Sequence, residues 1–133
     1  MSIKKWSAQR SELKDIFDWL HEQLGGNECR KAKFLELAVE EIVVNNISYA
    51  YDNGGELQLF FERNGDQVIV EVRDWGKAFD PLTGKKQVDK TIPLEERQEG
   101  GFGIMIATHT VDHIEYRREN TSNVVKLSQS ITS

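Results

Sequence analysis

The stretch Leu37-Ala-Val-Glu-Glu-Ile-Val-Val-Asn45 decides the fold of this chain. Apolar side chains point in almost every direction around a helix built from it, which predicts that the helix is buried. Glu41 and Asn45 lie one turn apart on one face of that helix. A buried carboxylate needs a partner, and a cation, a polarised water or a nucleotide would each serve. The alternative is a solvated edge, with Glu41 paired to a lysine such as Lys33, and the helix alone leaves both open.

Secondary-structure signals continue on both sides of this helix. Glycines end helices, and apolar residues at period two mark strands on either side of an Asn-Gly turn. The elements predicted up to the end of the hairpin are a strand over 2–7, a helix from Ser7 or Ser11 to Leu24, the buried helix over about 28–51, and strands around 57–61 and 68–72 joined at Asn64-Gly65.

The second half of the chain predicts a long polar loop, a helix and two closing strands. The loop covers residues 77–100, the helix runs from about 101 to 111, and the strands cover about 112–118 and 123–130. A loop of this length in a small domain is usually functional. The order of elements predicts an α/β two-layer sandwich, in which a mixed, mostly antiparallel sheet is covered on one face by three helices.

Composition excludes several classes of function. The 133 residues fit a single domain, 1–133, and the formal net charge is −5. An acidic chain without a basic stripe is a poor ligand for nucleic acid or for an anionic membrane. Cys29 is the only cysteine, so no disulfide can form within the chain. With no apolar signal segment at the start, we expect a cytoplasmic protein.

Two glycine-containing motifs follow the buried helix. Asp74-Trp75-Gly76 ends a predicted strand, where the aspartate can accept a hydrogen bond from an exocyclic amine and the glycine lets backbone approach a flat ring. Gly100-Gly-Phe-Gly103 opens a predicted helix, whose free N–H groups suit phosphate. Each motif alone also fits an ordinary turn or loop-to-helix junction. Neither belongs to a P-loop or a Rossmann unit.

Taken together in this order, the motifs resemble those of the GHKL (Bergerat-fold) ATPases. Residues 37–45 look like the N-box of that family, and 74–81 look like its first glycine box. Pro93-Leu-Glu-Glu-Arg97 and Gly100-Gly-Phe-Gly-Ile104 resemble the end of the lid and the second glycine box. The resemblance covers roughly residues 8–128, and the most similar branch is that of the stand-alone anti-sigma-factor serine/threonine kinases.

The resemblance implies a site for ATP and Mg²⁺. Glu41 would be the general base, Asn45 would be the Mg²⁺ ligand, Asp74 would bind the adenine amine, and Gly76 would lie beneath the ring. Ala78 stands where the family often has a second glycine. The other residues that the resemblance assigns to the nucleotide are Arg97, Gly101, Phe102 and Gly103.

The branch also implies an activity and partners. The chain would phosphorylate a serine of a small antagonist (an anti-anti-sigma protein), bind a sigma factor or another regulator, and form a homodimer. Two departures from the family pattern favour an alternative. Tyr49 replaces a frequent histidine, and Asn123-Val124 replaces a stretch that often carries a hydroxyl residue. The alternative is an ATP-gated protein-binding module with little or no phosphotransfer.

Overall fold

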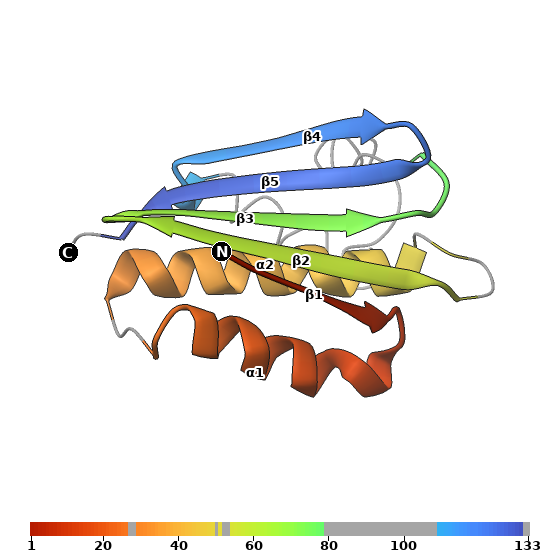
Figure 1. Ribbon diagram of the computed structural model, residues 1–133, viewed down its shortest axis with the longest axis horizontal. Coiled ribbons are helices and arrows are strands. Elements are labelled where there is room, and N and C mark those ends of the chain that lie inside the picture. The colour runs from red at the N-terminus through yellow and green to blue at the C-terminus, as the bar shows by residue number, and fades with distance from the viewer. Residues whose placement is uncertain (27–28, 50, 52–53, 79–108, 132–133) are drawn as a thin grey trace, which may run out of the picture.

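A computed structural model describes residues 1–26, 29–49, 51, 54–78 and 109–131 of the chain. These residues form five strands and two helices, with a short 3-10 turn at Arg10–Glu12 before the first helix. Figure 1 shows their arrangement. In chain order the elements are β1 (Ser2–Ser7), α1 (Leu13–Gln23), α2 (Arg30–Tyr49), β2 (Glu56–Asn64), β3 (Gln67–Asp74), β4 (His113–Glu119) and β5 (Ser122–Ser130).

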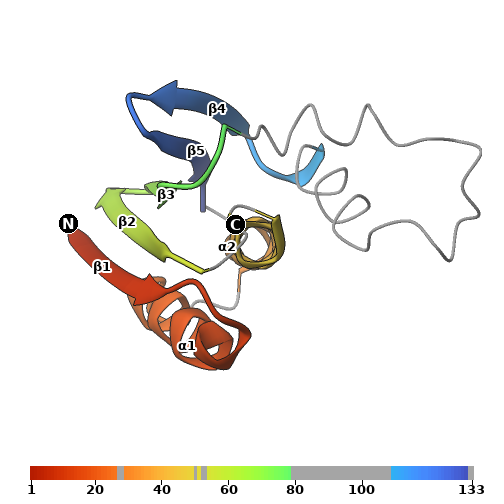
Figure 2. The same ribbon diagram turned by 90° about the vertical axis from the view of Figure 1, so that its right-hand side faces the viewer.

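The strands form one sheet in the order β1-β2-β3-β5-β4. All four pairings among these strands are antiparallel, which confirms the mostly antiparallel sheet and leaves no parallel pair among the described residues. Both helices lie on the same face of the sheet (Figure 2). The predicted third helix, 101–111, lies outside the described residues except at its end, where residues 109–110 are helical. The two-layer α/β fold is therefore the predicted one.

The core lies between the sheet and the two helices. Alternate residues of each strand point toward the helices, because successive strand side chains face opposite ways. On β2 these are Leu57, Leu59 and Phe61, and the antiparallel register sets them opposite helix-facing residues of β3. The buried helix residues that meet them are Ile16, Leu20, Leu35, Ala38, Val39, Ile42 and Val43.

Two tryptophans join β1 to α1. The rings of Trp6 and Trp19 meet edge to face, with centroids 5.4 Å apart. The indole Nε1 of Trp6 donates a hydrogen bond of 2.7 Å to Asp15 on α1. The predicted serine cap is wrong, because Glu12 occupies the N-cap of α1 and makes no side-chain capping bond. The aromatic contact and the Asp15 bond fix this helix on the sheet instead.

The hairpin turn is shifted by one residue from its predicted place. Asn64 pairs with Gln67 as the last rung between β2 and β3, so the two turn residues are Gly65 and Asp66. Gly65 has φ +62°, a conformation that disfavours residues with a Cβ. Gly-Asp therefore closes the hairpin, and Asn64 belongs to the strand.

Among the described elements, the sheet and α1 cover one side of helix α2 (Figure 2). Its apolar composition predicted burial nearly all round, yet Leu37 keeps 60% of its surface exposed, while Leu35 and Val39 are fully buried. Glu41, one turn after Leu37, is half-buried. In the described ranges, no helix is long and apolar enough to cross a membrane.

Candidate functional site

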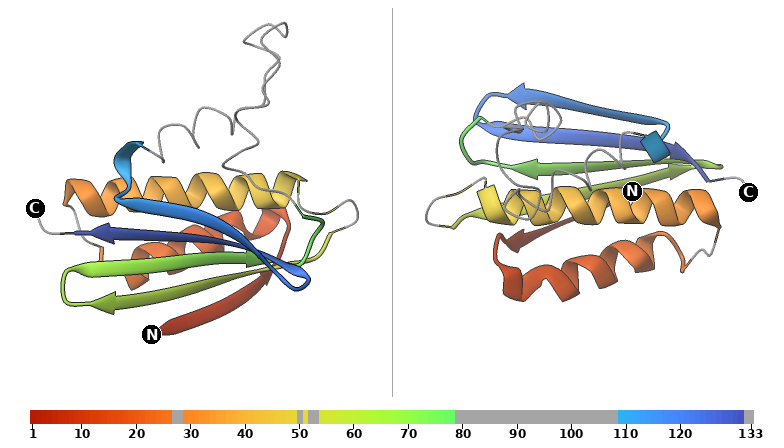
Figure 3. Two further views of the ribbon diagram at one scale, coloured as in Figure 1. Left: turned by 90° about the horizontal axis from the view of Figure 1, so that it is seen from above. Right: turned by 180° about the vertical axis from the view of Figure 1, so that it is seen from behind.

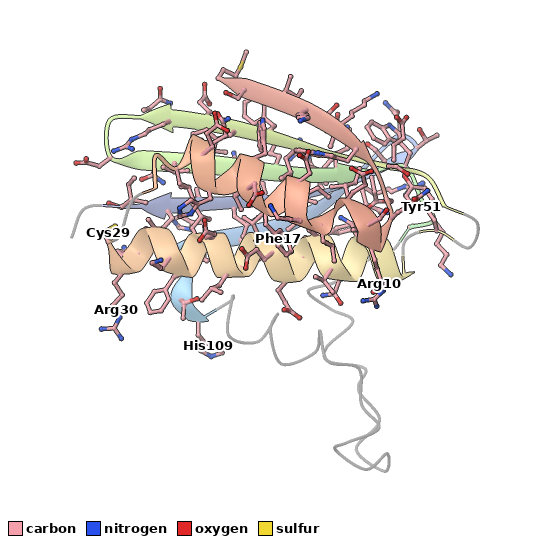
Figure 4. The ribbon with its side chains drawn as sticks, turned by 90° about the horizontal axis from the view of Figure 1, so that it is seen from below. Arg10, Phe17, Cys29, Arg30, Tyr51 and His109 are labelled. Carbon is pink, nitrogen blue, oxygen red and sulfur yellow. The ribbon has the colours of Figure 1, made fainter. Side chains whose placement is uncertain are left out.

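The C-terminal ends of α2 and β3 lie at the same end of the molecule (Figures 1 and 3). Tyr51, which follows α2 closely, connects these ends. Its hydroxyl donates a hydrogen bond of 2.6 Å to the carbonyl of Glu56 and accepts one of 2.7 Å from the N–H of Trp75. Figure 4 shows Tyr51 at the end of α2 opposite Cys29. A single hydroxyl thus fixes the backbone that follows Asp74 against the end of the helix.

The position of the Tyr51 ring also explains the nearby Gly55. A Cβ at residue 55 would overlap the tyrosine ring, so only glycine fits beside it. Burial raises the pKa of the Tyr51 phenol, against the opposing effect of the Trp75 N–H bond. The phenol therefore stays protonated and continues to donate to Glu56.

Asp74 is the buried carboxylate of this site, with 3% of its surface exposed. Its Oδ1 accepts two hydrogen bonds, one of 2.9 Å from Asn123 Nδ2 and one of 2.8 Å from the N–H of Gly76. Burial raises the pKa of Asp74, while the bonds from Asn123 and Gly76 and the positive charge of Arg118 oppose that rise. Within the described residues, Oδ2 has no hydrogen-bond partner. Asp74 thus keeps one acceptor oxygen available.

Four residues around this carboxylate form a closed set of hydrogen bonds, here called the Asp74 ring: Asp74, Gly76, Arg118 and Asn123. Asp74 accepts from Gly76 and Asn123 as described above. Arg118 Nη1 donates to the carbonyl of Gly76 at 2.8 Å and to Asn123 Oδ1 at 3.1 Å. The Tyr116 hydroxyl also donates a hydrogen bond of 2.6 Å to Asn123 Oδ1. The ring fixes the turn after β3 to the start of β5.

On α2 the predicted residues lie one turn apart, as their spacing requires. Asn45 is buried, with 8% of its surface exposed, and its amide makes no hydrogen bond within the part of the chain that the structure describes. Glu41 is half-buried and has a polar or electrostatic partner. Burial, reinforced by the charges of Glu36 and Glu41, raises the pKa of the neighbouring Glu40. This part of α2 therefore combines crowded carboxylates with a buried amide that has no partner among the described residues.

The remaining predicted site residues divide into two groups. Gly76 is half-buried and belongs to the Asp74 ring, whereas Ala78 is exposed two residues later. Outside the described residues lie Arg97, Gly101, Phe102 and Gly103.

Sequence reasoning missed three of the residues that surround Asp74. Tyr51, Tyr116 and Arg118 contact the site from other elements, and no local motif marks them. Asn123 was noticed only as a departure from a family pattern, although it bonds directly to Asp74. The antiparallel register offers the one available signal, since it sets Asp74 opposite Asn123 and Asn123 opposite Arg118.

The donor set at this site fits a magnesium-bound nucleotide. In the described part of the chain, the Asp74 oxygen without a partner matches an exocyclic amine, and the buried Asn45 amide without a partner offers oxygen, which Mg²⁺ prefers. No group of three or more His, Cys, Asp or Glu suited to a metal occurs among the described residues. A cation here would therefore need oxygen from its own ligand as well, as a triphosphate provides.

Comparison with known proteins gives a consistent result. The model of the histidine kinase-like ATPase domain family matches residues 7–129. The serine-protein kinase RsbW of Halalkalibacterium halodurans is 28% identical over 89 residues, covering 65% of this chain and 55% of the relative. RsbW of Staphylococcus aureus strain MSSA476 is 29% identical over 91 residues, covering 64% and 57%. The chain thus spans little more than half the length of these relatives.

Solved structures show the same fold at low identity. The RsbU and RsbW domains of a Mycobacterium tuberculosis protein match with a TM-score of 0.62 and 13% identity, covering all of this chain and 33% of the other. The catalytic domain of the histidine kinase ThkA matches with a TM-score of 0.59 and 14% identity, covering 99% and 97%.

Proposed function

Because this chain belongs to the histidine kinase-like ATPase domain family, we propose that it is an ATP-dependent serine/threonine protein kinase of the partner-switching type. The family of ATPase domains implies that it binds ATP. The relatives named serine-protein kinase RsbW support transfer to a protein serine rather than to a histidine.

One observation carries the proposal, namely the burial and incomplete hydrogen bonding of the Asp74 carboxylate. This carboxylate is buried, two donors hold one of its oxygens, and the other oxygen has no partner among the described residues. A chain gains nothing in stability from a buried carboxylate that is half satisfied, because the lost hydration is not recovered. A bound adenine would donate its exocyclic amine to that oxygen and restore the missing bond.

The other residues then take the following roles. The buried Asn45 amide would offer its oxygen to Mg²⁺, and Gly76 would let backbone lie against the adenine ring. Glu41, one turn before Asn45, would accept the proton of the attacking hydroxyl as general base. Bound Mg·ATP supplies the phosphoryl group, and the chain's own residues position it and neutralise charge. By the family resemblance, Ala78 lines the base pocket, while Arg97, Gly101, Phe102 and Gly103 contact the phosphates.

The proposed partners follow from the resemblance of the sequence motifs to the anti-sigma-factor kinases. The phospho-acceptor would be a serine on a small anti-anti-sigma antagonist, and a sigma factor or another regulator would be the protein held in its absence. We propose that the kinase acts in the cytoplasm as a homodimer. Its net charge of −5 makes nucleic acid and anionic membranes unsuitable partners.

A phosphotransfer assay tests the proposal directly. Purified chain, γ-labelled ATP and the antagonist encoded beside it are incubated with Mg²⁺, and label on an antagonist serine is measured. Glu41→Ala is expected to keep ATP binding and to slow transfer about 100-fold or more, as expected for loss of a general base. Glu40→Ala is the matched control, because it removes the adjacent carboxylate from the same helix and is expected to leave transfer within about 3-fold of the wild type.

Two results would contradict parts of this assignment. Wild-type transfer rates in Glu41→Ala would remove the general base. ATP binding by the wild-type chain without label on any antagonist would favour the ATP-gated binding module, for which Tyr49 and Asn123 are the sequence features.

A further inference from the structure

We propose that Asn123 is a positioning residue that selects the base of the nucleotide. It holds Asp74 so that a single carboxylate oxygen, Oδ2, faces the ligand as an acceptor. The Asp74 ring and Tyr116 in turn fix the Asn123 amide. The inference rests on the proposed binding of ATP and assigns specificity within that site to residues of β4 and β5.

Four contacts of Asn123 with described residues determine which way its amide points. Nδ2 lies 2.9 Å from the Asp74 carboxylate and 2.8 Å from the carbonyl of Lys77, and both of these groups accept hydrogen bonds. Oδ1 lies 3.1 Å from Arg118 Nη1, which can only donate, and 2.6 Å from the Tyr116 hydroxyl. A flipped amide would set its oxygen against two acceptors and its NH₂ against a guanidinium. Only the observed orientation satisfies all four partners.

The fixed amide determines how the carboxylate is presented. The last torsion of an aspartate side chain is soft, so the carboxyl group could otherwise rotate and exchange its two oxygens. Asn123 Nδ2 and the N–H of Gly76 both point at Oδ1, which stops that rotation. Every polar side-chain atom that is fully buried among the described residues has a partner, so the partnerless Oδ2 keeps some accessible surface. A ligand therefore meets one acceptor in one orientation.

This arrangement selects a chemical class of base. An ionised carboxylate oxygen rewards a donor, such as the 6-amino group of a purine, and repels a 6-oxo group, which is itself an acceptor. The Asn123 and Gly76 bonds and the charge of Arg118 all favour the ionised form of Asp74 against its burial. The ring thus fixes the orientation of the carboxylate and opposes the loss of charge that burial favours, and discrimination between amino and oxo purines requires both.

The test separates a role in selecting the base from a role in supporting the fold. Dissociation constants are measured by calorimetry for Mg·ATP, for Mg·purine riboside triphosphate, which lacks the 6-amino group, and for Mg·ITP, which has a 6-oxo group. The wild type is expected to prefer ATP over both analogues by about 10-fold or more. In Asn123→Ala that preference is expected to fall to about 3-fold or less, mainly through weaker binding of ATP.

A charge-matched pair on β4 provides the control. Arg118→Gln removes the donor to Asn123 and Gly76, whereas Arg117→Gln makes the same change in a side chain that pairs with Glu119 and Glu71. We expect Arg118→Gln to reduce the preference for ATP about 3-fold or more, and Arg117→Gln to leave it unchanged.

A second variant serves if Asn123→Ala does not fold. Tyr116→Phe removes the hydrogen bond to Asn123 Oδ1 and is expected to reduce the preference for ATP by about 3-fold.

The possible outcomes are distinguishable. If Asn123→Ala and Arg118→Gln weaken ATP and purine riboside triphosphate equally, the ring only supports the fold and this inference is overturned, while ATP binding stands. If the wild type binds neither nucleotide, the proposed function fails and the inference fails with it. The inference is supported if the folded variants lose the preference for ATP over purine riboside triphosphate while Arg117→Gln keeps it.

Discussion

Strand β5 carries two buried amide side chains, Asn123 near its start and Gln129 near its end, and they are used differently. Gln129 is fully buried, and all its partners are backbone groups. Its Nε2 donates to the carbonyls of Lys31 and Thr110 at 3.0 and 3.1 Å, and its Oε1 accepts from the N–H of Asp112 at 2.7 Å. The bonds that Asn123 makes with described residues instead include three side chains and one carbonyl.

The difference indicates that Gln129 holds elements of the fold together, whereas Asn123 supports a site for a ligand. The Gln129 bonds join β5, the start of α2 and the turn before β4, and they leave no amide atom of Gln129 without a partner. The Asn123 bonds lead to Asp74, whose second oxygen has no partner among the described residues. Both amides are satisfied, as buried polar groups must be, but only the Asn123 network continues to an atom that a bound molecule could complete.

The comparison predicts its largest effect at Asp74. Asp74→Asn keeps an oxygen that can accept from Asn123 and Gly76, so we expect the free energy of unfolding to change by less than about 1 kcal/mol. We expect ATP affinity to fall about 100-fold or more, because an ionised acceptor facing the base is lost. Calorimetry with Asp112→Asn as control, for which affinity should not change, measures this. Unchanged affinity in Asp74→Asn would remove the adenine assignment.

A second, smaller effect is expected at the other end of β5. Gln129→Ala leaves the N–H of Asp112 and the carbonyl of Thr110 without these partners, which should lower the free energy of unfolding by about 2 kcal/mol. Urea denaturation measures the loss. The preference for ATP over purine riboside triphosphate should not change in the folded variant. If that preference fell as it does in Asn123→Ala, the two amides would not have separate roles.

The smallest effect is on how the free energy of unfolding depends on pH, because Asp74 and Asp112 contribute with opposite sign. Burial raises the pKa of Asp74, so its contribution to stability is present below the unfolded pKa and is lost as pH rises through the folded pKa. The Ser130 N–H, followed by Lys31, lowers the pKa of Asp112, so its contribution is present above the unfolded pKa and is lost as pH falls through the folded pKa.

Unfolding experiments on Asp74→Asn and Asp112→Asn between pH 3 and pH 7 test this contrast. Relative to the wild type, Asp74→Asn should become more stable as pH rises, and Asp112→Asn should become less stable. We expect each difference to stay below about 1 kcal/mol, because Asp112 and Lys31 are partly exposed and Asp74 has compensating bonds. The same sign in both variants would contradict the contrast.

Much of the fold was predictable because its signals are local. Alternating apolar residues predicted β2 and β3, and the apolar 37–45 stretch predicted α2. The errors are local as well. Asn64-Gly65 and Gly65-Asp66 are both acceptable turn pairs, and cross-strand register decided between them.

The candidate site was predictable only where one motif contains the residue. Asp74 and Gly76 belong to such a motif, and so do Glu41 and Asn45. Their support comes from distant positions: Tyr51 reaches Trp75 across 24 residues, and Asn123 reaches Asp74 across 49. Those contacts depend on which strands pair and in what register, which follows from the packing of the whole sheet.

The Tyr51 bond to the Trp75 backbone has a practical consequence. The chain contains three tryptophans, and Trp6 on β1 and Trp19 on α1 meet edge to face. Trp75, 36% exposed, stands beside Asp74, with Lys5 Nζ 4.8 Å from the centre of its ring. Its indole emission is therefore expected to change when a nucleotide binds at Asp74. Trp75→Phe would separate that signal from the constant emission of the other pair.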